Sequence, residues 1–357
     1  MCNRCFNSFS CFVSPDVVDE LLKSADPAIR DAALETTKLS AEARTMRFMT
    51  QMMPQLSAIP SPSNSKYRLV YDMREVGNML ALPGTLVREE GGSESTDAAV
   101  NEAYEFAGVT YDCYKEVFGR NSLDDNGMQL ISSVHFGRRF QNGFWNGFQM
   151  AYGDGDGQIF LRFTKSLDVV AHELTHGVIT HSSNLVYQDE PGALNESFAD
   201  VMSAIVVQWD RKQSVDEADW LMGNELMGPA LGGTARAFRV FDEGKAYENH
   251  PVLGTDRQPK HIRDKYTGTQ DNGGVHINSG IPNHAFYRVA KKLGGNSWEA
   301  AGQIWYETLL SLRSTSDFRH CAETCLQVAR KNYGTGSAEE QAVIEGWQAV
   351  GLLQAGV

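Results

Sequence analysis

The spacing of hydrophobic residues divides the chain into stretches of different character. From Asp16 to Leu22 and from Ala28 to Met53, apolar residues recur at every third or fourth position, which is typical of amphipathic helices. Residues 54–65 follow with three prolines and four serines, a composition that predicts a linker. We therefore expect residues 1–65 to form a short helical unit with its linker, separate from the rest of the chain.

The remaining chain is rich first in strands and then in helices. Short runs of β-branched and aromatic residues predict strands at residues 67–71, 86–87, 128–136 and 149–152, with an amphipathic helix among them at 97–118. After residue 186 helical spacing dominates, at residues 193–209, 282–293, 297–313, 317–333 and 338–350. The pattern predicts an α+β fold, with a strand-rich lobe over residues 66–185 and a mainly helical lobe over residues 186–357.

Composition removes several classes of protein from consideration. The 357 residues carry a net charge of −13, which argues against nucleic acid or an anionic membrane as the main partner, because both attract basic surfaces. No apolar run reaches membrane-spanning length, and the N-terminus lacks the continuous apolar core of a signal peptide. Localisation therefore stays open between the cytoplasm and secretion by a non-standard route. The six cysteines do not form the pattern of a disulfide framework, so we expect reduced thiols.

The most informative chemistry lies in the stretch His172-Glu173-Leu174-Thr175-His176. Histidines at positions i and i+4 of a helix lie on the same face, so both imidazoles can bind one metal ion. Glu173 is turned about 100° away from His172 by the helical period, which keeps it off the metal but beside a metal-bound water. A carboxylate there can take a proton from that water as it attacks a carbonyl carbon. The alternative is a solvated helix face that happens to carry two histidines, but the apolar neighbours of the motif indicate a buried helix.

A catalytic zinc ion needs at least one more protein ligand. Glu196 is the best candidate, because it begins a predicted second helix twenty residues after His176, and Pro191-Gly192 predicts the loop that lets this helix fold back. Asp200 lies one turn further on, where its carboxylate can accept the second ring N–H of a ligating histidine. The alternative for both carboxylates is a solvated helix edge, which the core-like residues that follow them argue against.

With its surroundings, this motif resembles the thermolysin-like neutral zinc metallopeptidases. The resemblance rests on His172-Glu173-x-x-His176, on Asn195-Glu196-x-x-x-Asp200, and on matching stretches at residues 142–147, 152–157 and 271–280. It extends from about Tyr67 to the C-terminus and implies a two-lobed zincin with the zinc helix between the lobes. The N-terminal unit looks like the short inhibitory prosegment of the protealysin subgroup, so we expect a proenzyme.

The resemblance implies a role for each residue that matches a family motif. The implied zinc ligands are His172, His176 and Glu196. Glu173 would act as general base and then as proton shuttle, and Asp200 would orient a zinc ligand. Tyr187 and His276 would stabilise the oxyanion, with Asp271 orienting His276, since polar donors aimed at a developing oxyanion are what acyl transfer needs. The alternatives are a loop aromatic that packs on the core for Tyr187 and a turn residue for His276.

Further matches imply how a substrate is held. Asn142 and the backbone of Gly143, where the family more often has alanine, would hold the substrate in an extended conformation. Arg239 would bind the carbonyl next to the cut, with Arg236 as the alternative. The implied pocket residues are all apolar: Phe160, Phe163, Val169, Met222 and Phe238. We therefore expect cleavage of internal peptide bonds just before a hydrophobic residue, with Phe163 narrowing the pocket.

Calcium binding is expected to differ from that of the family. Asp168 matches one ligand of the family's double calcium site, but Val207, Leu221 and Asn224 occupy positions where other ligands would be. We therefore expect the double site to be largely lost, while a calcium ion elsewhere stays open.

The N-terminal unit is expected to inhibit the enzyme to which it is attached. Cys11 could place a thiolate on zinc, since sulfur is a soft ligand, and its alternative is a free buried cysteine. The expected partners are protein or peptide substrates and the chain's own prosegment, and the expected state is a monomer. Two other functions stay open from the sequence. One is a catalytically silent relative that binds or inhibits, and the other is a different zinc hydrolase, such as an aminopeptidase or esterase.

Overall fold

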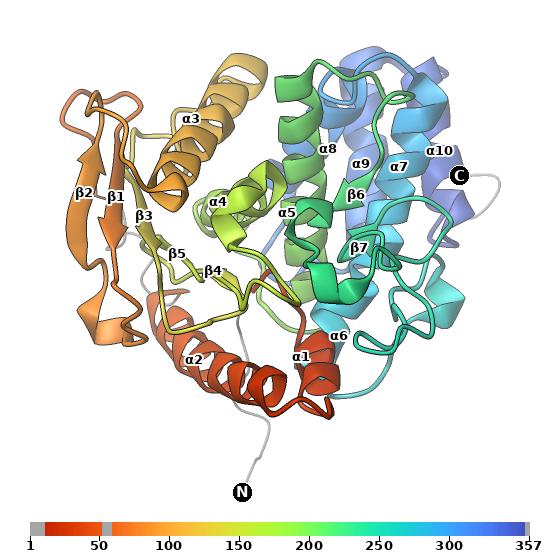
Figure 1. The fold of residues 1–357 in the computed structure, drawn as a ribbon. Helices are drawn as coiled ribbons and strands as arrows, with labels where there is room; N and C mark the ends of the chain where they lie inside the picture. Colours follow the sequence, from red (N-terminus) through yellow and green to blue (C-terminus); the bar gives the residue numbers. More distant parts are fainter. Residues whose placement is uncertain (1–10, 52–58, 354–357) are drawn as a thin grey trace, which may run out of the picture.

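The computed structural model describes residues 11–51 and 59–353, which form two lobes with an N-terminal helical segment lying across them (Figure 1). The helices are α1 Pro15–Leu21, α2 Pro27–Gln51, α3 Ala98–Phe118, α4 Leu167–Thr180, α5 Asp189–Arg211, α6 Asp271–Asn278, α7 Gly280–Leu293, α8 Ala300–Ser311, α9 Phe318–Tyr333 and α10 Ala338–Ala349. The strands are β1 Arg68–Asp72, β2 Thr85–Glu89, β3 Leu130–Val134, β4 Gly143–Trp145, β5 Met150–Tyr152, β6 Leu221–Met222 and β7 Arg239–Val240. Part of the predicted linker lies outside the described residues. The N-terminal cysteines Cys2 and Cys5 also lie outside them.

The first lobe is built on a five-stranded sheet with the order β2-β1-β3-β5-β4. The inner pairs β1–β3 and β3–β5 are parallel, and the outer pairs β1–β2 and β4–β5 are antiparallel. Helix α3 packs against the sheet, and α4 lies between the sheet and the helices of the second lobe (Figure 1). Strand β4 is the edge strand nearest to α4, so its outer edge remains available for another extended segment.

Helix α4 is the centre of the molecule. All fourteen of its residues are buried, although the helix carries two histidines and two acidic residues. Helix α5 packs along α4, and α7, α8 and α9 pack against α5, with α10 packed on α7 and α9 (Figure 1). Buried polar side chains must find partners, so the polar residues of α4 and α5 are constrained to meet one another. The prediction of a two-lobed α+β fold with this helix at the junction is confirmed.

The beginning of α5 differs from the sequence prediction. Pro191 and Gly192 are not in a loop but in the first turn of the helix, which begins at Asp189. Proline is tolerated there because the first N–H groups of a helix have no partner within it. Glycine fits because an added Cβ at residue 192 would lie only 2.5 Å from Val275 Cγ1 and 2.9 Å from the backbone of Tyr187. This close approach brings α6 and the segment before α5 together at the site described below.

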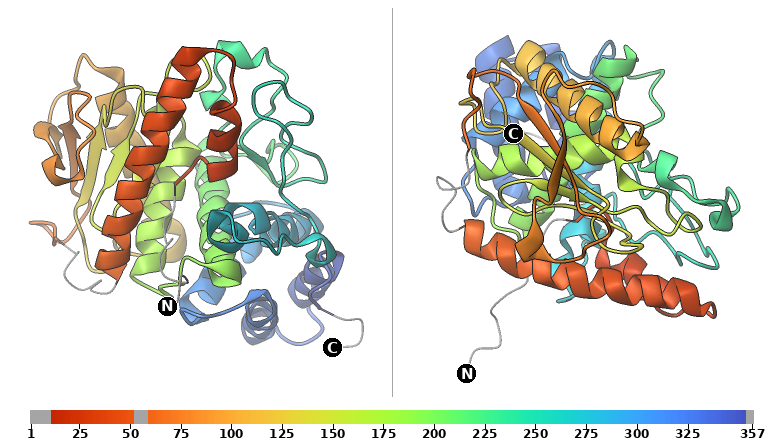
Figure 2. Two further views of the ribbon diagram at one scale, coloured as in Figure 1. Left: turned by 90° about the horizontal axis from the view of Figure 1, so that it is seen from below. Right: turned by 60° about the vertical axis from the view of Figure 1, so that its left-hand side comes forward.

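The N-terminal helices lie side by side and span both lobes, as the view from below shows (Figure 2, left). The buried face of α2 includes Ala33, Thr36 and Leu39. The Thr36 hydroxyl accepts a hydrogen bond from the Gln141 N–H (3.0 Å). Helix α1 buries Val17, Val18 and Leu21. Within the described part of the chain, no helix is long and apolar enough to cross a membrane.

Candidate active site

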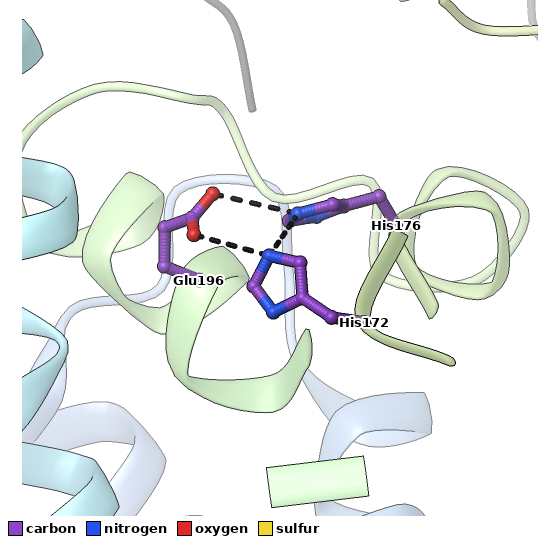
Figure 3. Close-up of side chains that lie close together, drawn as sticks. All are labelled: His172, His176 and Glu196. Atoms are coloured by element: carbon purple, nitrogen blue, oxygen red, sulfur yellow. Dashed lines mark hydrogen bonds and ion pairs between the residues drawn. The ribbon is translucent and has the colours of Figure 1, made fainter. Parts of the chain in front are cut away.

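Three buried side chains from α4 and α5 converge on one point (Figure 3). The Nε2 atoms of His172 and His176 are 3.0 Å apart, and the carboxylate oxygens of Glu196 lie 3.4 and 3.5 Å from them. Four ligands around a tetrahedral zinc ion at about 2.1 Å lie about 3.4 Å from one another, so these separations fit zinc. Among the described residues this is the group of histidine, cysteine and acidic side chains that could hold a metal ion.

Polar neighbours orient both histidines. His172 Nδ1 lies 2.8 Å from an Asp200 carboxylate oxygen, and His176 Nδ1 lies 2.8 Å from the amide oxygen of Asn195. Contacts of this kind fix which ring nitrogen carries the proton and leave Nε2 for the metal. Asn195 in turn donates to the carbonyl of Leu185 (3.0 Å), and Asn283 donates to Asp200 (2.8 Å).

Two acidic groups of the site, Glu196 and Asp200, are held in their ionised form. Burial opposes ionisation of Glu196, but the charges of His276 and His176 outweigh burial and hold the pKa of Glu196 well below its usual value. Burial also opposes ionisation of Asp200, where Arg239 and His172 lower the pKa. Burial alone would lower the pKa of His172, yet the nearby carboxylates raise it to about 9. This histidine must release a proton in order to bind a metal ion.

Glu173 is not one of the converging ligands, as expected for the second residue of the motif. Its Oε2 accepts a hydrogen bond from the backbone N–H of Trp145 in β4 (3.0 Å), and the side chain is fully buried. The edge strand therefore positions this carboxylate.

Tyr187, His276 and Asp271 meet next to the cluster. The Tyr187 hydroxyl donates to Glu196 and lies 3.2 Å from His276 Nε2. Asp271 contacts His276 twice, because its Oδ1 lies 2.6 Å from Nδ1 and its Oδ2 accepts the backbone N–H (2.8 Å). Burial would lower the pKa of His276, but Asp271 and Glu196 raise it to about 10.

An unusual backbone makes this contact between Asp271 and His276 possible. Four consecutive residues, 271–274, have positive φ angles between 51° and 84°, so the chain turns sharply before α6 continues. Gly273 and Gly274 tolerate this conformation, and an added Cβ on Gly273 would lie 2.1 Å from Asp189 Oδ1. The sequence prediction treated these residues only as a motif and did not predict the helix.

The segment that begins at Cys11 runs along the outer edge of β4, in the groove between that strand and the side chains of Arg239 and His276, which we call the cleft. The Phe12 N–H donates to the carbonyl of Gly143 (3.4 Å), and Asn142 exchanges two hydrogen bonds with the backbone of Val13 (2.9 and 3.3 Å). Arg239 donates to the Phe12 carbonyl (2.8 Å). The expected substrate-binding residues thus contact the chain's own N-terminal segment.

Arg239 is held for this contact by Asp200, since its Nη2 lies 2.7 Å from Oδ1. Arg236, the alternative, instead forms an ion pair with Asp242 at the surface (2.7 Å). Arg239 and not Arg236 therefore reaches the cleft.

The side chain of Phe12 fills the expected apolar pocket. Its ring is fully buried, lies edge-on to His172 and Phe238 with centroids 5.4 and 5.2 Å away, and approaches Gly223. The other expected pocket residues belong to the same buried cluster: Phe160, Phe163, Val169 and Met222. The pocket therefore accommodates an aromatic ring directly beside a metal ligand.

Two further expectations concern Cys11 and Asp168. Cys11 does not belong to the converging ligand group, and its carbonyl oxygen lies 2.8 Å from His276 Nε2. Asp168 is already engaged by the Ser166 hydroxyl and by the Gly223 N–H (2.6 Å), so it serves as a buried anchor between α4 and β6.

Sequence reasoning missed three residues that organise the site. Asn195 precedes Glu196 in the motif, and its adjacency to a ligand was an available signal. Asn283 and Phe12 gave no local signal. Asn283 acts through Asp200, which is 83 positions away in the sequence, and Phe12 acts through His172, which is more than 100 positions away.

Family models match most of the chain. One described as the thermolysin metallopeptidase catalytic domain matches residues 49–180, and one described as the α-helical domain of the same metallopeptidase matches residues 183–352. The chain belongs to the thermolysin family of metallopeptidases. As a member of the family it is a zinc metalloprotease, and the predictions of a thermolysin-like hydrolase and of zinc as its metal are confirmed.

Named relatives of this metallopeptidase agree with the assignment. Protease PrtS of Photorhabdus sp. is 42% identical over 97% of this chain and 93% of its own length. An extracellular metalloprotease of Pectobacterium carotovorum is 45% identical over 82% of each chain. The thermostable neutral protease NprT of Geobacillus stearothermophilus is 39% identical over 79% of this chain. The match covers about half (50%) of the length of NprT.

A solved structure extends the likeness to the N-terminal helices. The precursor of protealysin, a metalloproteinase from Serratia proteamaculans, has a TM-score of 0.85 and 39% sequence identity, and the match covers 96% of this chain and 100% of that chain. The likeness to a precursor supports the prediction that this thermolysin-like protease is made as a proenzyme.

Proposed function

We propose that this protein is a zinc endopeptidase, made as a proenzyme, that hydrolyses internal peptide bonds just before hydrophobic residues. The observation that carries the proposal is the buried group of His172, His176 and Glu196 with Glu173 beside it. The separations among the three ligand atoms suit tetrahedral zinc, and Glu173, which follows His172 in the motif, supplies the base.

Each charged side chain has a chemical task in this proposal. Zinc held by the three ligands would polarise the substrate carbonyl and lower the pKa of a water molecule. Glu173 takes a proton from the water and passes it to the nitrogen of the leaving amine. His276 and Tyr187 donate hydrogen bonds to the oxyanion, which preorganised donors stabilise without reorganisation. Asp271 positions His276, and Asp200 positions both His172 and Arg239.

The edge of β4 supports an extended mode of substrate binding. Asn142 and the Gly143 carbonyl offer main-chain hydrogen bonds of the kind used when a peptide adds a strand to a sheet. Arg239 binds the carbonyl of the residue after the cut. The apolar pocket beside His172 favours a hydrophobic side chain at that residue, and the burial of Phe12 there supports this preference.

Residues 1–65 act as an inhibitory prosegment with its linker in this proposal, ahead of lobes at 66–185 and 186–357. The support is direct contact, because Cys11, Phe12 and Val13 bond to the residues that would bind a substrate. We further propose that the protein is a monomer. We also propose that the double calcium site is largely lost, since Asp168 is engaged by protein groups and apolar side chains occupy two of the other ligand positions.

The test uses end-blocked peptides that contain a single internal Leu or Phe. The matured wild-type protein should cut just before that residue, and the Glu173→Gln variant should be slower by about 10²–10⁴-fold at unchanged zinc content, because it loses the proton-transfer group and no ligand. An aminopeptidase would leave such peptides intact. A Glu173→Gln variant as active as the wild type would contradict the assigned role of Glu173.

A further inference from the structure

The N-terminal segment enters the cleft with one peptide bond in a defined position. Cys11 pairs with Phe144 of β4 as an antiparallel bridge, and Phe12 and Val13 continue along the same edge. The hydrogen bonds fix both the direction and the register of the segment, because each backbone group from Phe12 N–H to Val13 carbonyl has its own partner. A shift by one residue would break all of them.

In this register the bond between Cys11 and Phe12 lies at the catalytic groups. The Cys11 carbonyl oxygen is 2.8 Å from His276 Nε2, one of the proposed oxyanion donors. The residue after the bond, Phe12, fills the apolar pocket, and its own carbonyl is held by Arg239. Every contact that the proposed function assigns to a substrate on the leaving side of the cut is made by this segment.

We propose that the bond between Cys11 and Phe12 is a substrate of the chain's own catalytic site and is hydrolysed within the same molecule. This inference rests on the proposed function. Water adds across the bond: its hydroxyl joins the Cys11 carbonyl carbon, the C–N bond to Phe12 breaks, and the proton taken up by Glu173 passes to the Phe12 nitrogen. The products are a peptide that ends in the carboxylate of Cys11 and a chain that begins with Phe12.

This cut does not open the cleft. The new N-terminal residue keeps its ring in the pocket, its carbonyl on Arg239 and its neighbour Val13 on Asn142. Helices α1 and α2 remain packed on both lobes. The nicked chain is therefore a product complex that stays latent, and removal of the remaining prosegment by a later cut is needed for activity.

The experiment follows the intact mass and the N-terminal sequence of the zinc-loaded full chain over time. The expected product is a chain that starts at Phe12, formed at a rate that does not change when the protein is diluted. Glu173→Gln should form it at least about a hundredfold more slowly. Phe12→Leu should retain the cut because leucine also fits an apolar pocket, Phe12→Asp should lose it, and Leu34→Ala on the exposed face of α2 should behave as the wild type.

Mixing separates cleavage within one molecule from cleavage between molecules. Glu173→Gln protein labelled with ¹⁵N is incubated with unlabelled wild type, and its Cys11–Phe12 bond should stay intact while that of the wild type is cut. Cleavage of both at equal rates would overturn the intramolecular step. If matured wild type cuts blocked peptides but its precursor never yields a chain or fragment that begins at Phe12, the inference fails and the proposed function stands. If neither substrate is cut, both fail.

Discussion

At the scale of single residues, Phe12 links the prosegment to the chemistry of the site. Its ring packs against His172 and lies in the apolar pocket. Arg239 donates a hydrogen bond to the Phe12 carbonyl, and its guanidinium carbon lies 4.5 Å from the centroid of the Phe12 ring. The sequence predicted the pocket through its resemblance to a family, but it did not predict which residue of the prosegment fills it. That choice depends on the register along β4, which no local pattern in residues 1–15 reveals.

Phe12→Ala should weaken docking of the prosegment. Truncating a buried Phe costs about 3 kcal/mol or more, which corresponds to at least about a hundredfold rise in the fraction of open cleft. We expect the unprocessed variant to cut a blocked peptide faster than the unprocessed wild type by a comparable factor. The measurement is initial rate on chains whose full mass is verified. Leu34→Ala is the control, and equal latency of Phe12→Ala and wild type would contradict the prediction.

We expect Asp16 to make docking of the proposed prosegment depend on pH. Burial raises its pKa, Ser14 and the charges of His276 and Arg257 partly oppose this, and Asp271 reinforces it. Its Oδ1 has no hydrogen-bond partner among the described residues. Because the pKa of Asp16 is higher in the docked state, protonation of Asp16 favours docking. This contribution to the free energy of docking is complete at acid pH and is lost as the pH rises through the raised pKa. Docking should therefore be weaker at neutral than at acid pH.

Asp16→Asn should remove this dependence. The neutral amide avoids the buried charge, so the variant precursor should be more latent than wild type at pH 7.5, and the two should converge near pH 4.5. Peptidase activity of the intact precursor across this range is the measurement. Asp19→Asn, on the exposed side of the same helix, controls for net charge. A parallel pH profile for Asp16→Asn and wild type would refute the role of Asp16.

At the scale of elements, hydrophobic spacing predicted the long helices well because each has one buried face. Helices α3, α9 and α10 begin and end within one or two residues of their predicted bounds. The start of α5 and the whole of α6 were missed, since proline, glycine and positive φ angles indicate loops locally. Tertiary contacts determine the structure of both segments. The absence of a side chain at Gly192 lets Val275 pack closely, and the Asp271 carboxylate accepts hydrogen bonds from N–H groups of α6.

A charged contact joins α3 to the turn after β5. His135 Nε2 lies 2.7 Å from Asp97, the residue that caps α3, and its Nδ1 lies 2.8 Å from Asp154. The hydrogen bond with Asp154 is the largest cause that raises the pKa of His135 to about 9. Protonated His135 therefore stabilises the folded state through its contacts with both carboxylates. This stabilisation is complete below the unfolded-state pKa near 6.5 and is lost as the pH rises through the folded-state pKa of about 9.

His135→Gln should therefore lower stability by a pH-dependent amount. Both carboxylates are partly exposed, so solvent screening reduces the effect to about 1–2 kcal/mol at pH 6. The difference in melting temperature between variant and wild type should shrink from pH 6 to pH 10. Adding Asp154→Asn should flatten the profile, and a difference that stays constant over this range would show that the charge of His135 does not contribute.

At the scale of the whole molecule, a buried catalytic helix lies between a sheet and a helical bundle, and the N-terminal helices lie across both (Figures 1 and 2). The sequence predicted the two lobes and the metal ligands, because a five-residue motif and a second helix are local features. It did not predict that β4 would accept the prosegment as an added strand. That contact joins residues 129 positions apart, so it emerges only when the fold brings them together.

The central claim is that one zinc ion, held by His172, His176 and Glu196, makes this chain a peptidase. The most direct measurement is a zinc titration of matured, chelator-treated protein, with cleavage of an end-blocked peptide as the readout. The account predicts that activity is absent without zinc, rises in proportion to the zinc added and reaches its plateau at one equivalent per chain. Full activity in the thoroughly chelated protein, or no activity once zinc has bound, would contradict it.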